Sequence, residues 1–201
     1  MSKDLQRLYE GKLYQTDSKI KEMKTHAREI MYQLNQTHPS ENKKREQLIT
    51  ELFGKVGKDV TVKVPFYCSH GTNIEVGDHC FINLDCIFLD LNKIILGNHV
   101  LIGPRVSIYT ASHPIDPIVR QHDLEYALPV EIGNDVWIGG NVVINPGVKI
   151  GNNVIIGSGS VVTKDVEDDV IVVGNPARVL RKITQEDHDY WIQQEKEYFE
   201  E

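Results

Sequence analysis

The sequence predicts a mainly β fold, a solenoid of short parallel strands flanked by helices. Two observations predict it. The first is a six-residue pattern with a branched apolar residue at its third position, which runs from Val130 and is preceded by a similar block beginning near Val76. The second is helical spacing of apolar residues towards the two ends of the chain. A period of six fits neither the 3.6-residue helix nor simple strand alternation, but it fits short strands joined by sharp corners.

The third position of the repeat is expected to point inward and to form a continuous apolar column. Twelve residues hold it: Val76, Ile82, Phe88, Leu96, Ile102, Ile108, Ile132, Ile138, Ile144, Ile150, Ile156 and Val162. The earlier block slips by two residues near Asn92 and Lys93. Gly usually follows the inward residue, and we expect Gly or Asn there to supply the positive φ that a corner can require. Cys80 and Cys86 fill the small first position of their units and are expected to pack rather than to react.

Helices are predicted at both ends. Residues 4–36 carry apolar residues among charges with a break near Gly11, and Ser40 is the predicted N-cap of a further helix. Residues 184–200 are predicted to form a C-terminal helix capped by Thr184. Such helices could cover the ends of the solenoid, where strand edges would otherwise be unpaired.

The chain is therefore divided into a helical segment at 1–54, a solenoid domain at 55–183 and a C-terminal helix at 184–201. The repeat is interrupted by a long loop at 109–129, which reads Y-T-A-S-H-P-I-D-P-I-V-R-Q-H-D-L-E-Y-A-L-P. Loops of this length in compact folds tend to be functional or disordered. Two histidines, several acidic and tyrosine residues and three prolines within it favour a functional site.

Composition excludes several classes of function. The 201 residues include 22 Lys and Arg against 29 Asp and Glu, for a net charge of −7, so no basic footprint for nucleic acid is present. No apolar run has membrane-spanning length, and the first residues are polar, unlike a secretory signal. Three cysteines do not suggest a disulfide framework, and the cytoplasm is the expected location.

The motifs then lead to a family. The insertion opens with T-A-S-H-P, and the repeat resumes as P-V-E-I-G-N-D-V-W-I-G-G-N-V-V-I-N-P-G-V and closes with G-S-G-S-V-V-T-K-D and G-N-P-A-R-V-L-R-K-I. With G-K-L-Y-x-x-D and N-x-T-H-P-S near the N-terminus, the chain resembles the maltose and galactoside O-acetyltransferases over nearly its whole length. The resemblance implies a left-handed parallel β-helix, a homotrimer with sites between subunits, and acetyl transfer from acetyl-CoA to a sugar hydroxyl without a metal. Handedness comes from the family and not from the spacing.

Acetyl transfer from a thioester to an alcohol needs a base, donors for the oxyanion and alignment of both substrates. The resemblance places the catalytic histidine at His113, although a loop histidine packed against Pro114 is the simpler alternative. Glu125 is the candidate to orient this imidazole, with Asp116, Asp123 or a backbone carbonyl as alternatives. No nucleophile is required.

The resemblance also implies the two binding sites. The positions that match those contacting the cofactor in the family are Gly140, Ser158, Thr163, Lys164, Arg178 and Arg181. The basic residues suit the phosphates of coenzyme A, although each alone could be a solvated surface charge. Trp137 is either a cofactor contact or an interface aromatic. The positions that match those contacting the acceptor are Asp17, Ser69, Asn83 and Asp90. Asn83 could instead be a turn residue that tolerates positive φ.

Three alternatives remain open. One is an acetyltransferase of the same fold that acts on an amine, an antibiotic or serine. Another is a metal enzyme of the carbonic anhydrase type, which needs three converging imidazoles. Its candidates are His70, His79, His99, His113 and His122. The third is a non-catalytic solenoid scaffold, which would have no need of a histidine-bearing insertion.

Overall fold

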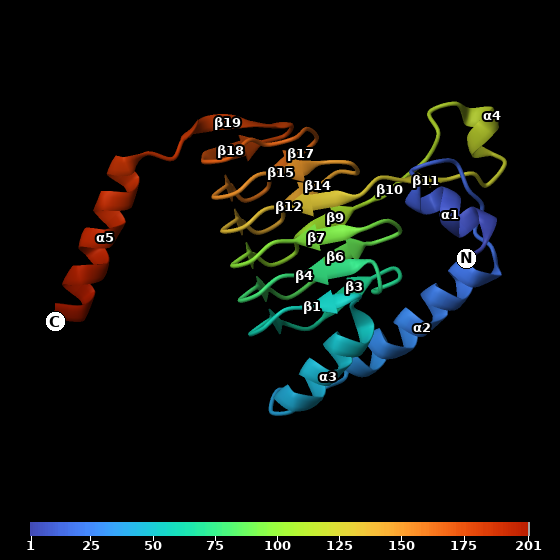
Figure 1. Ribbon diagram of the computed structural model, residues 1–201, viewed down its shortest axis with the longest axis horizontal. Coiled ribbons are helices and arrows are strands. Elements are labelled where there is room, and N and C mark those ends of the chain that lie inside the picture. Colours follow the sequence, from blue (N-terminus) through green and yellow to red (C-terminus); the bar gives the residue numbers. More distant parts are fainter. Residues whose placement is uncertain (201) are drawn as a thin grey trace.

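The computed structural model describes residues 1–200 and shows a parallel β-solenoid of six coils with helices at both ends (Figure 1). Each coil contributes a short strand to each of three sheets, except where the stack ends. Sheet 1 contains β1 (Lys55–Val56), β4 (Ile74–Val76), β7 (Ile94–Leu96), β12 (Val130–Ile132) and β15 (Lys149–Ile150). Sheet 2 contains β2 (Thr61–Val62), β5 (Phe81–Ile82), β8 (Leu101–Ile102), β13 (Trp137–Ile138), β16 (Ile155–Ile156), β18 (Val170–Gly174) and the antiparallel β19 (Ala177–Lys182). Sheet 3 contains β3 (Phe66–Cys68), β6 (Cys86–Leu89), β9 (Ser107–Tyr109), β14 (Val143–Ile144) and β17 (Val161–Val162).

The turns between these sheets form three corners that run the length of the solenoid. Corner A joins sheet 1 to sheet 2, corner B joins sheet 2 to sheet 3, and corner C joins sheet 3 back to sheet 1. The insertion leaves from corner C after β9 and returns to β12. It carries the hairpin strands β10 (Ala111–Ser112) and β11 (Tyr126–Ala127) and the short helix α4 (Pro117–Arg120).

The predicted inward column is confirmed. All twelve residues at the third position of the repeat are at most 4% exposed, and they form the main core. The two-residue slip is also visible in the strand register. Phe81 pairs with Leu101, twenty residues later, whereas Trp137 pairs with Ile155, eighteen residues later. The early coils therefore contain two more residues than the later ones.

The expected role of the repeat glycines is wrong. The left-handed residue of each corner comes two positions later, as at Asp135 (φ 58°) and Asn153 (φ 52°). Gly133 is needed for a different reason, because a Cβ there would lie 2.6 Å from the carbonyl oxygen of Gly151 in the next coil. The glycines therefore allow consecutive coils to approach closely.

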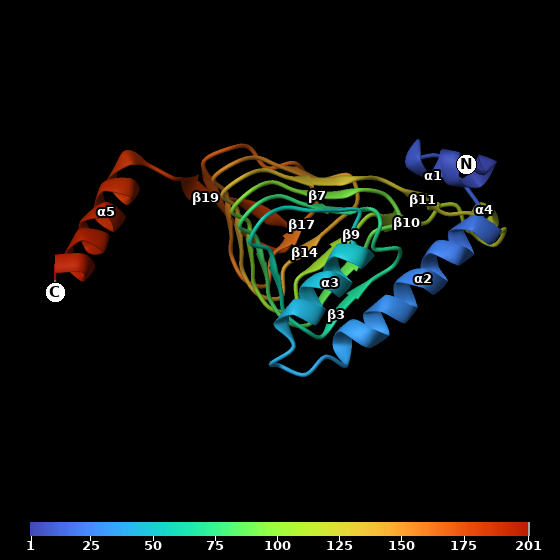
Figure 2. The same ribbon diagram turned by 60° about the horizontal axis from the view of Figure 1, so that its bottom comes forward.

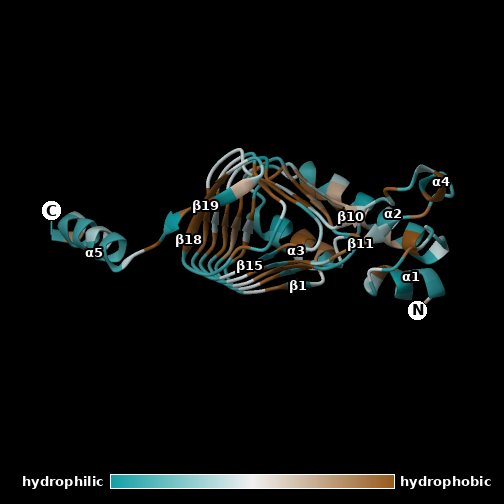
Figure 3. Ribbon diagram, turned by 90° about the horizontal axis from the view of Figure 1, so that it is seen from above, coloured by the Kyte–Doolittle hydropathy of each residue, from teal (hydrophilic) through white to brown (hydrophobic). Residues whose placement is uncertain are grey.

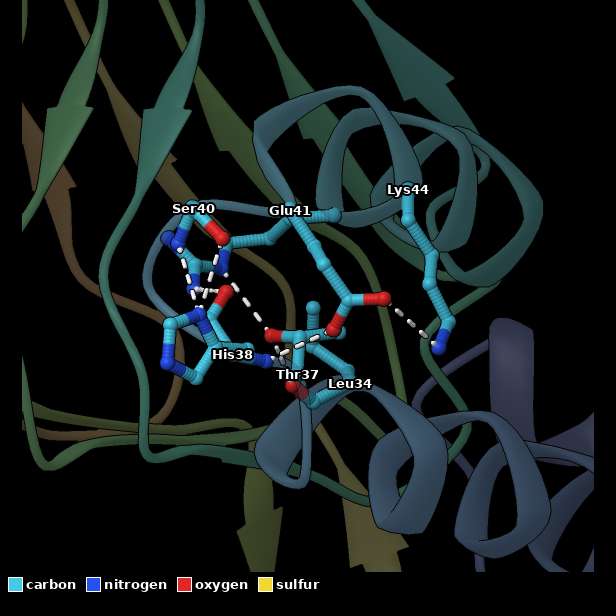
Figure 4. A network of polar contacts seen from close by, with 7 residues as sticks. Leu34, Thr37, His38, Ser40, Glu41 and Lys44 are labelled. Atoms are coloured by element: carbon cyan, nitrogen blue, oxygen red, sulfur yellow. Dashed lines mark hydrogen bonds and ion pairs between the residues drawn. The ribbon is translucent and has the colours of Figure 1, made fainter.

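Three helices precede the solenoid: α1 (Lys3–Tyr9), α2 (Ser18–Asn35) and α3 (Asn42–Leu52). Helix α3 lies at the open end of the first coil and buries Leu48 and Leu52 in the main core, so the end is covered as expected (Figure 2). The predicted cap is wrong, because the N-cap of α3 is Glu41 and not Ser40. The hydroxyl of Ser40 instead bonds the ring of His38 at 2.8 Å, within the turn that joins α2 to α3 (Figure 4).

The C-terminal helix α5 (Gln185–Glu200) is capped as predicted. Thr184 and Asp187 bond each other reciprocally, Thr184 N–H to the carboxylate at 2.9 Å and Asp187 N–H to the hydroxyl at 3.4 Å. The helix does not cover the solenoid, because it extends away from it, is largely hydrophilic and buries none of its side chains (Figure 3). Among residues 1–200, no helix is long and apolar enough to cross a membrane.

Candidate active site

The insertion presents His113 at the end of a two-stranded hairpin. Strands β10 and β11 pair antiparallel, with Ala111 opposite Ala127 and Ser112 opposite Tyr126. Extending this register by one residue sets His113 opposite Glu125. The imidazole is exposed, so it is open to a ligand.

The other carboxylates of the insertion are placed differently. Asp116 is the N-cap of α4, and its carboxylate accepts the N–H groups of Ile118 and Val119 at 2.9 Å. Asp123 is an exposed left-handed residue with φ 56°. Of the three candidate carboxylates, the hairpin therefore sets only Glu125 opposite His113.

Sequence reasoning missed a contact between the N-terminal segment and Glu125. Tyr14 pairs with Glu125 through two backbone hydrogen bonds of 2.9 and 3.1 Å, and its hydroxyl donates to Glu125 Oε2 at 3.2 Å. Next to it, Gln15 donates its side-chain amide to the carbonyl of His122 at 2.8 Å. The only available signal was that Tyr14 belongs to the G-K-L-Y-x-x-D motif.

Two of the predicted acceptor residues are linked at corner C. Asp90 follows β6, and its Oδ1 accepts the N–H groups of Ser69 and His70 at 2.8 Å, while Oδ2 faces the N–H of Asn73 at 3.4 Å. Burial raises the pKa of Asp90 to about 7, although these N–H donors act in the opposite direction. Asp90 is 0% exposed, so in a single chain it shapes the turn that carries Ser69 and has no surface for an acceptor.

His70, in the same turn, is fully buried, and its Nε2 has no hydrogen-bond partner among the described residues. Burial lowers the pKa of His70 to about 4, so the ring is neutral near pH 7. His79 and His99 lie elsewhere, stacked at corner A with ring centroids 4.9 Å apart. In the part of the chain that the structure describes, no three His, Cys, Asp or Glu side chains are grouped to hold a metal ion. Within a single chain, the five histidines are thus not grouped as a carbonic anhydrase site requires.

Asp17 and Asn83 lie apart. Asp17 is the N-cap of α2, and hydrogen bonds from Ser2 and from the N–H of Ile20, the latter at 2.9 Å, keep its pKa below the ordinary value. Asn83 lies in corner B, where its amide oxygen accepts the N–H of Leu84. The left-handed residue of that turn is Asp85 and not Asn83, so positive φ does not explain the asparagine.

Three of the predicted cofactor residues gather at corner B. Gly140 and Ser158 occupy neighbouring coils, which the hydrogen bond from Gly159 N–H to Gly140 O joins at 2.9 Å. Arg178 reaches the same end of sheet 2, because it pairs with Val173 beside the last turn of this corner. Its guanidinium is exposed.

The other three cofactor residues lie elsewhere. Thr163 and Lys164 are exposed in corner C. Arg181 is engaged, since its guanidinium binds both carboxylate oxygens of Asp187 at 2.6 and 2.8 Å. This bond holds the pKa of Asp187 well below its usual range.

The candidate residues therefore fall mainly at the two corners that bound sheet 3. Corner C carries Ser69, Asp90, His113, Glu125, Thr163 and Lys164, and corner B carries Asn83, Gly140, Ser158 and Arg178. A single chain does not bring the two sets together. Cavities of about 540 and 310 Å³ lie by α3 and by the start of α5, and neither is lined by His113.

Known proteins share both the sequence and the fold. The family described as "Maltose acetyltransferase hexapeptide capping motif" matches residues 8–57, and "Bacterial transferase hexapeptide (six repeats)" matches residues 129–164. The chain is 41% identical over 193 residues to the galactoside O-acetyltransferase of Escherichia coli (strain K12), covering 95% of each chain.

Two solved structures agree with this relationship. A maltose O-acetyltransferase from Clostridium difficile 630 is 44% identical with a TM-score of 0.90, covering 91% of this chain and 98% of that one. A galactoside acetyltransferase in complex with coenzyme A is 40% identical with a TM-score of 0.91, covering 94% of each. With a hexapeptide solenoid, the capping motif and an exposed histidine on the insertion, this chain belongs to the hexapeptide-repeat family of maltose and galactoside O-acetyltransferases and is an acyltransferase.

Proposed function

We propose that this protein transfers the acetyl group of acetyl-CoA to a hydroxyl of a sugar or glycoside, with His113 as the general base. The observation that carries the proposal is the hairpin of β10 and β11, whose register, extended by one residue, sets the exposed imidazole of His113 opposite the carboxylate of Glu125. The related structures support the donor and the acceptor class, because one holds coenzyme A and another is of a maltose O-acetyltransferase.

The transfer proceeds by direct attack. His113 accepts the proton of the acceptor hydroxyl while the hydroxyl oxygen attacks the thioester carbonyl carbon. The carbon–sulfur bond then breaks, and the imidazolium returns the proton to the departing thiolate of coenzyme A. Glu125 accepts a hydrogen bond from the second ring nitrogen, which fixes the tautomer and stabilises the imidazolium.

A covalent acetyl-enzyme is not needed, and the thiols are poorly suited to form one. Cys68, Cys80 and Cys86 are all buried, and burial raises the pKa of each thiol, that of Cys86 to about 11. Since the thiolate is the nucleophilic form, these side chains are largely unreactive near pH 7.

Coenzyme A would use both corners. Its phosphates need cations, which Lys164 and Arg178 supply as exposed side chains, with Thr163 beside Lys164. Arg181 can bind a phosphate only by exchanging the carboxylate of Asp187 for it. The pantetheine arm would contact the turns that carry Gly140 and Ser158.

The acceptor would bind near His113. We propose that Ser69, Asn83 and Asp17 contact its hydroxyl groups, since hydroxyl, amide and carboxylate groups together offer donors and acceptors. Asp90 contributes by holding the N–H group of Ser69 at 2.8 Å, and so fixes the turn that presents Ser69.

We further propose a homotrimer with sites between subunits. The proposed base His113 and its partner Glu125 lie at corner C, whereas three of the six cofactor candidates, Gly140, Ser158 and Arg178, lie at corner B on the opposite side of sheet 3. A complete site therefore joins corner C of one copy to corner B of the next. Such a head-to-tail contact repeats until the ring closes.

The outward residues of the sheets support this assembly. On sheet 2 they are Thr61, Phe81, Leu101, Trp137, Ile155 and Ile171. On sheet 3 they are Tyr67, Ile87, Ser107, Val143 and Val161. Both columns are mainly apolar, as at a subunit interface. Sheet 1 instead carries the ion pairs of Lys93 with Glu75 and of Lys149 with Glu131, so it is proposed to face solvent.

The cytoplasm is the proposed location, since three free thiols suit a reducing compartment.

The test is release of free coenzyme A from acetyl-CoA with a panel of acceptors: maltose, glucose, thiogalactosides, chloramphenicol, serine and a simple amine. We expect turnover with a sugar that is lost in His113→Ala and kept in His122→Ala, a matched change of an exposed histidine on the same insertion. Turnover with only an amine, the antibiotic or serine would refute the sugar assignment. Full turnover by His113→Ala would refute the assignment of the base.

A further inference from the structure

Tyr14 is buried against the catalytic insertion although it lies in the N-terminal segment. Its ring is 1% exposed within a small apolar cluster that is separate from the main core and includes Leu8, Ile20, Leu91 and Ala127. Ala127 belongs to β11, so this cluster joins α1 and the start of α2 to the hairpin that carries His113 (Figure 1). The position of the ring is therefore fixed by packing on several sides.

Backbone pairing aligns Tyr14 with the general base. Tyr14 and Glu125 form an isolated antiparallel bridge, so the N-terminal segment lies beside the end of the hairpin that precedes β11. Extending the register of β10 and β11 by one residue sets His113 on the other side of Glu125. Residues directly opposite one another in antiparallel strands project to the same face. The side chains of Tyr14, Glu125 and His113 therefore stand in a row on one face, with the carboxylate in the middle.

Among the residues that the structure describes, the hydroxyl of Tyr14 makes one polar contact, the hydrogen bond to Glu125 Oε2 at 3.2 Å. Burial and the neighbouring Glu125 raise the pKa of Tyr14 well above its ordinary value, so the phenol stays neutral and can only donate to this carboxylate. Glu125 Oε1 accepts no hydrogen bond from the described residues, and it is the oxygen left for the imidazole.

We propose that Tyr14 is a positioning residue that holds Glu125 towards His113 and so fixes the general base. This inference rests on the proposed function, because it takes His113 as the base and Glu125 as its partner. The proposal gives the N-terminal segment a role in catalysis besides covering the solenoid.

The test compares Tyr14→Phe, Glu125→Gln and the double variant. Tyr14→Phe keeps the ring in the apolar cluster and removes only the hydroxyl. Thr37→Val is the control, because it also removes a buried hydroxyl that lies far from the insertion. This hydroxyl donates to the carbonyl of Leu34 at 2.7 Å and accepts from Arg45 Nε at 3.1 Å (Figure 4). If Tyr14→Phe and Thr37→Val have equal melting temperatures, a lower kcat in Tyr14→Phe alone cannot be caused by lower stability.

We expect Tyr14→Phe to lower kcat about tenfold, with an unchanged KM for acetyl-CoA, as for residues coupled within one hydrogen-bonded network. In the Glu125→Gln background the same change should cost nothing further, because the hydroxyl acts through the carboxylate. An additive loss in the double variant, or wild-type kcat in Tyr14→Phe, would overturn the proposal.

A second readout does not depend on turnover. In ¹⁵N-histidine NMR, Glu125→Gln should mix the tautomers of His113, and Tyr14→Phe should change the tautomer ratio in the same direction by a smaller amount. An unchanged His113 signal in Tyr14→Phe would overturn the role of Tyr14. If the wild-type protein acetylated none of the sugars, the proposed function would fail, and the NMR result would still decide whether Tyr14 positions the pair.

Discussion

Replacing Gly133 with alanine tests how consecutive coils stack. A Cβ at Gly133 would lie 2.6 Å from the carbonyl oxygen of Gly151 and 2.7 Å from its carbonyl carbon. Both are backbone atoms of the next coil, which the hydrogen bond from Gly133 N–H to Ile150 O holds at 2.8 Å. A clash with a flexible side chain could be relieved by rotation, whereas this one requires the two coils to separate.

The size of the effect follows from this geometry. Ordinary carbon contacts begin at 3.4 Å, so the coils would have to move apart by about 0.8 Å at this corner. Overpacking of this kind costs about 1–3 kcal/mol. Alanine also restricts the unfolded chain, which offsets about 0.4–1 kcal/mol of that cost. We expect a net loss of about 1–2 kcal/mol, or roughly 2–8 °C in Tm for a chain of this size.

Two other glycines serve as controls. At Gly140 a Cβ would meet Pro104 O at 3.3 Å and φ is not positive, so alanine should change stability by no more than about 0.5 kcal/mol. At Gly159 the space is open but φ is +75°, so alanine should cost about 1 kcal/mol through backbone strain alone. The assay is unfolding in urea at one protein concentration, because assembly would make stability depend on concentration. Equal stability of Gly133→Ala and Gly140→Ala would refute the close-approach explanation.

Four further outcomes are expected. His113→Ala should keep its oligomeric state and cofactor affinity but lose about 100-fold or more in turnover, and a wild-type rate would remove His113 from catalysis. Arg178→Ala and Lys164→Ala should each raise the KM for acetyl-CoA with little change at saturation, and unaltered values for both would exclude them from the cofactor site. Co-expressed His113→Ala and Ser158→Trp chains should recover about a quarter of wild-type activity. With random mixing, about a quarter of the sites combine an intact His113 from one chain with an intact Ser158 from the other. No recovery would contradict sites between copies. The stability should also depend on pH through two buried groups. The pKa of Asp90 is raised to about 7, so the contribution of Asp90 to stability falls as pH rises from about 4 to 7. The pKa of His70 is lowered to about 4, so the contribution of His70 is complete above about pH 6.5 and is lost as pH falls to about 4. In wild type the two slopes oppose each other, so Asp90→Asn should show stability rising between pH 4.5 and 6.5 in urea unfolding, and a flat profile would refute the assignment.

The solenoid was predictable from the sequence because each inward position is buried and must therefore be apolar, which makes the period visible. The twelve apolar positions and the two-residue slip follow from the six-residue pattern, and the structure confirms both. Handedness does not follow from the spacing and rests on the family. The function of the glycines was misjudged because a sequence shows where glycine occurs but not whether φ or a neighbouring backbone requires it.

Local capping was predictable only where both partners are close in sequence. Thr184 and Asp187 cap α5 as expected, because the box needs no other part of the chain. At α3 the carboxylate of Glu41 accepts hydrogen bonds from the N–H of His38 and the amine of Lys44. The hydroxyl of Ser40 bonds the ring of His38 (Figure 4). The contact between Tyr14 and Glu125 joins distant segments, so the G-K-L-Y-x-x-D motif marked Tyr14 but did not identify its partner.

The proposed site is divided between two corners, and the length of the coils determines which residues share a corner. A later coil contains eighteen residues, so residues of one corner recur at this interval, as Gly140 and Ser158 do. His113 belongs to corner C, and the hydrogen-bonded coils keep corners B and C on opposite sides of sheet 3. If His113 is the base and Gly140 and Ser158 contact the cofactor, as proposed, the two sets meet across an interface between copies. Assembly is therefore expected to be a condition for activity, and a variant that remains folded but monomeric should be inactive even with every candidate residue intact.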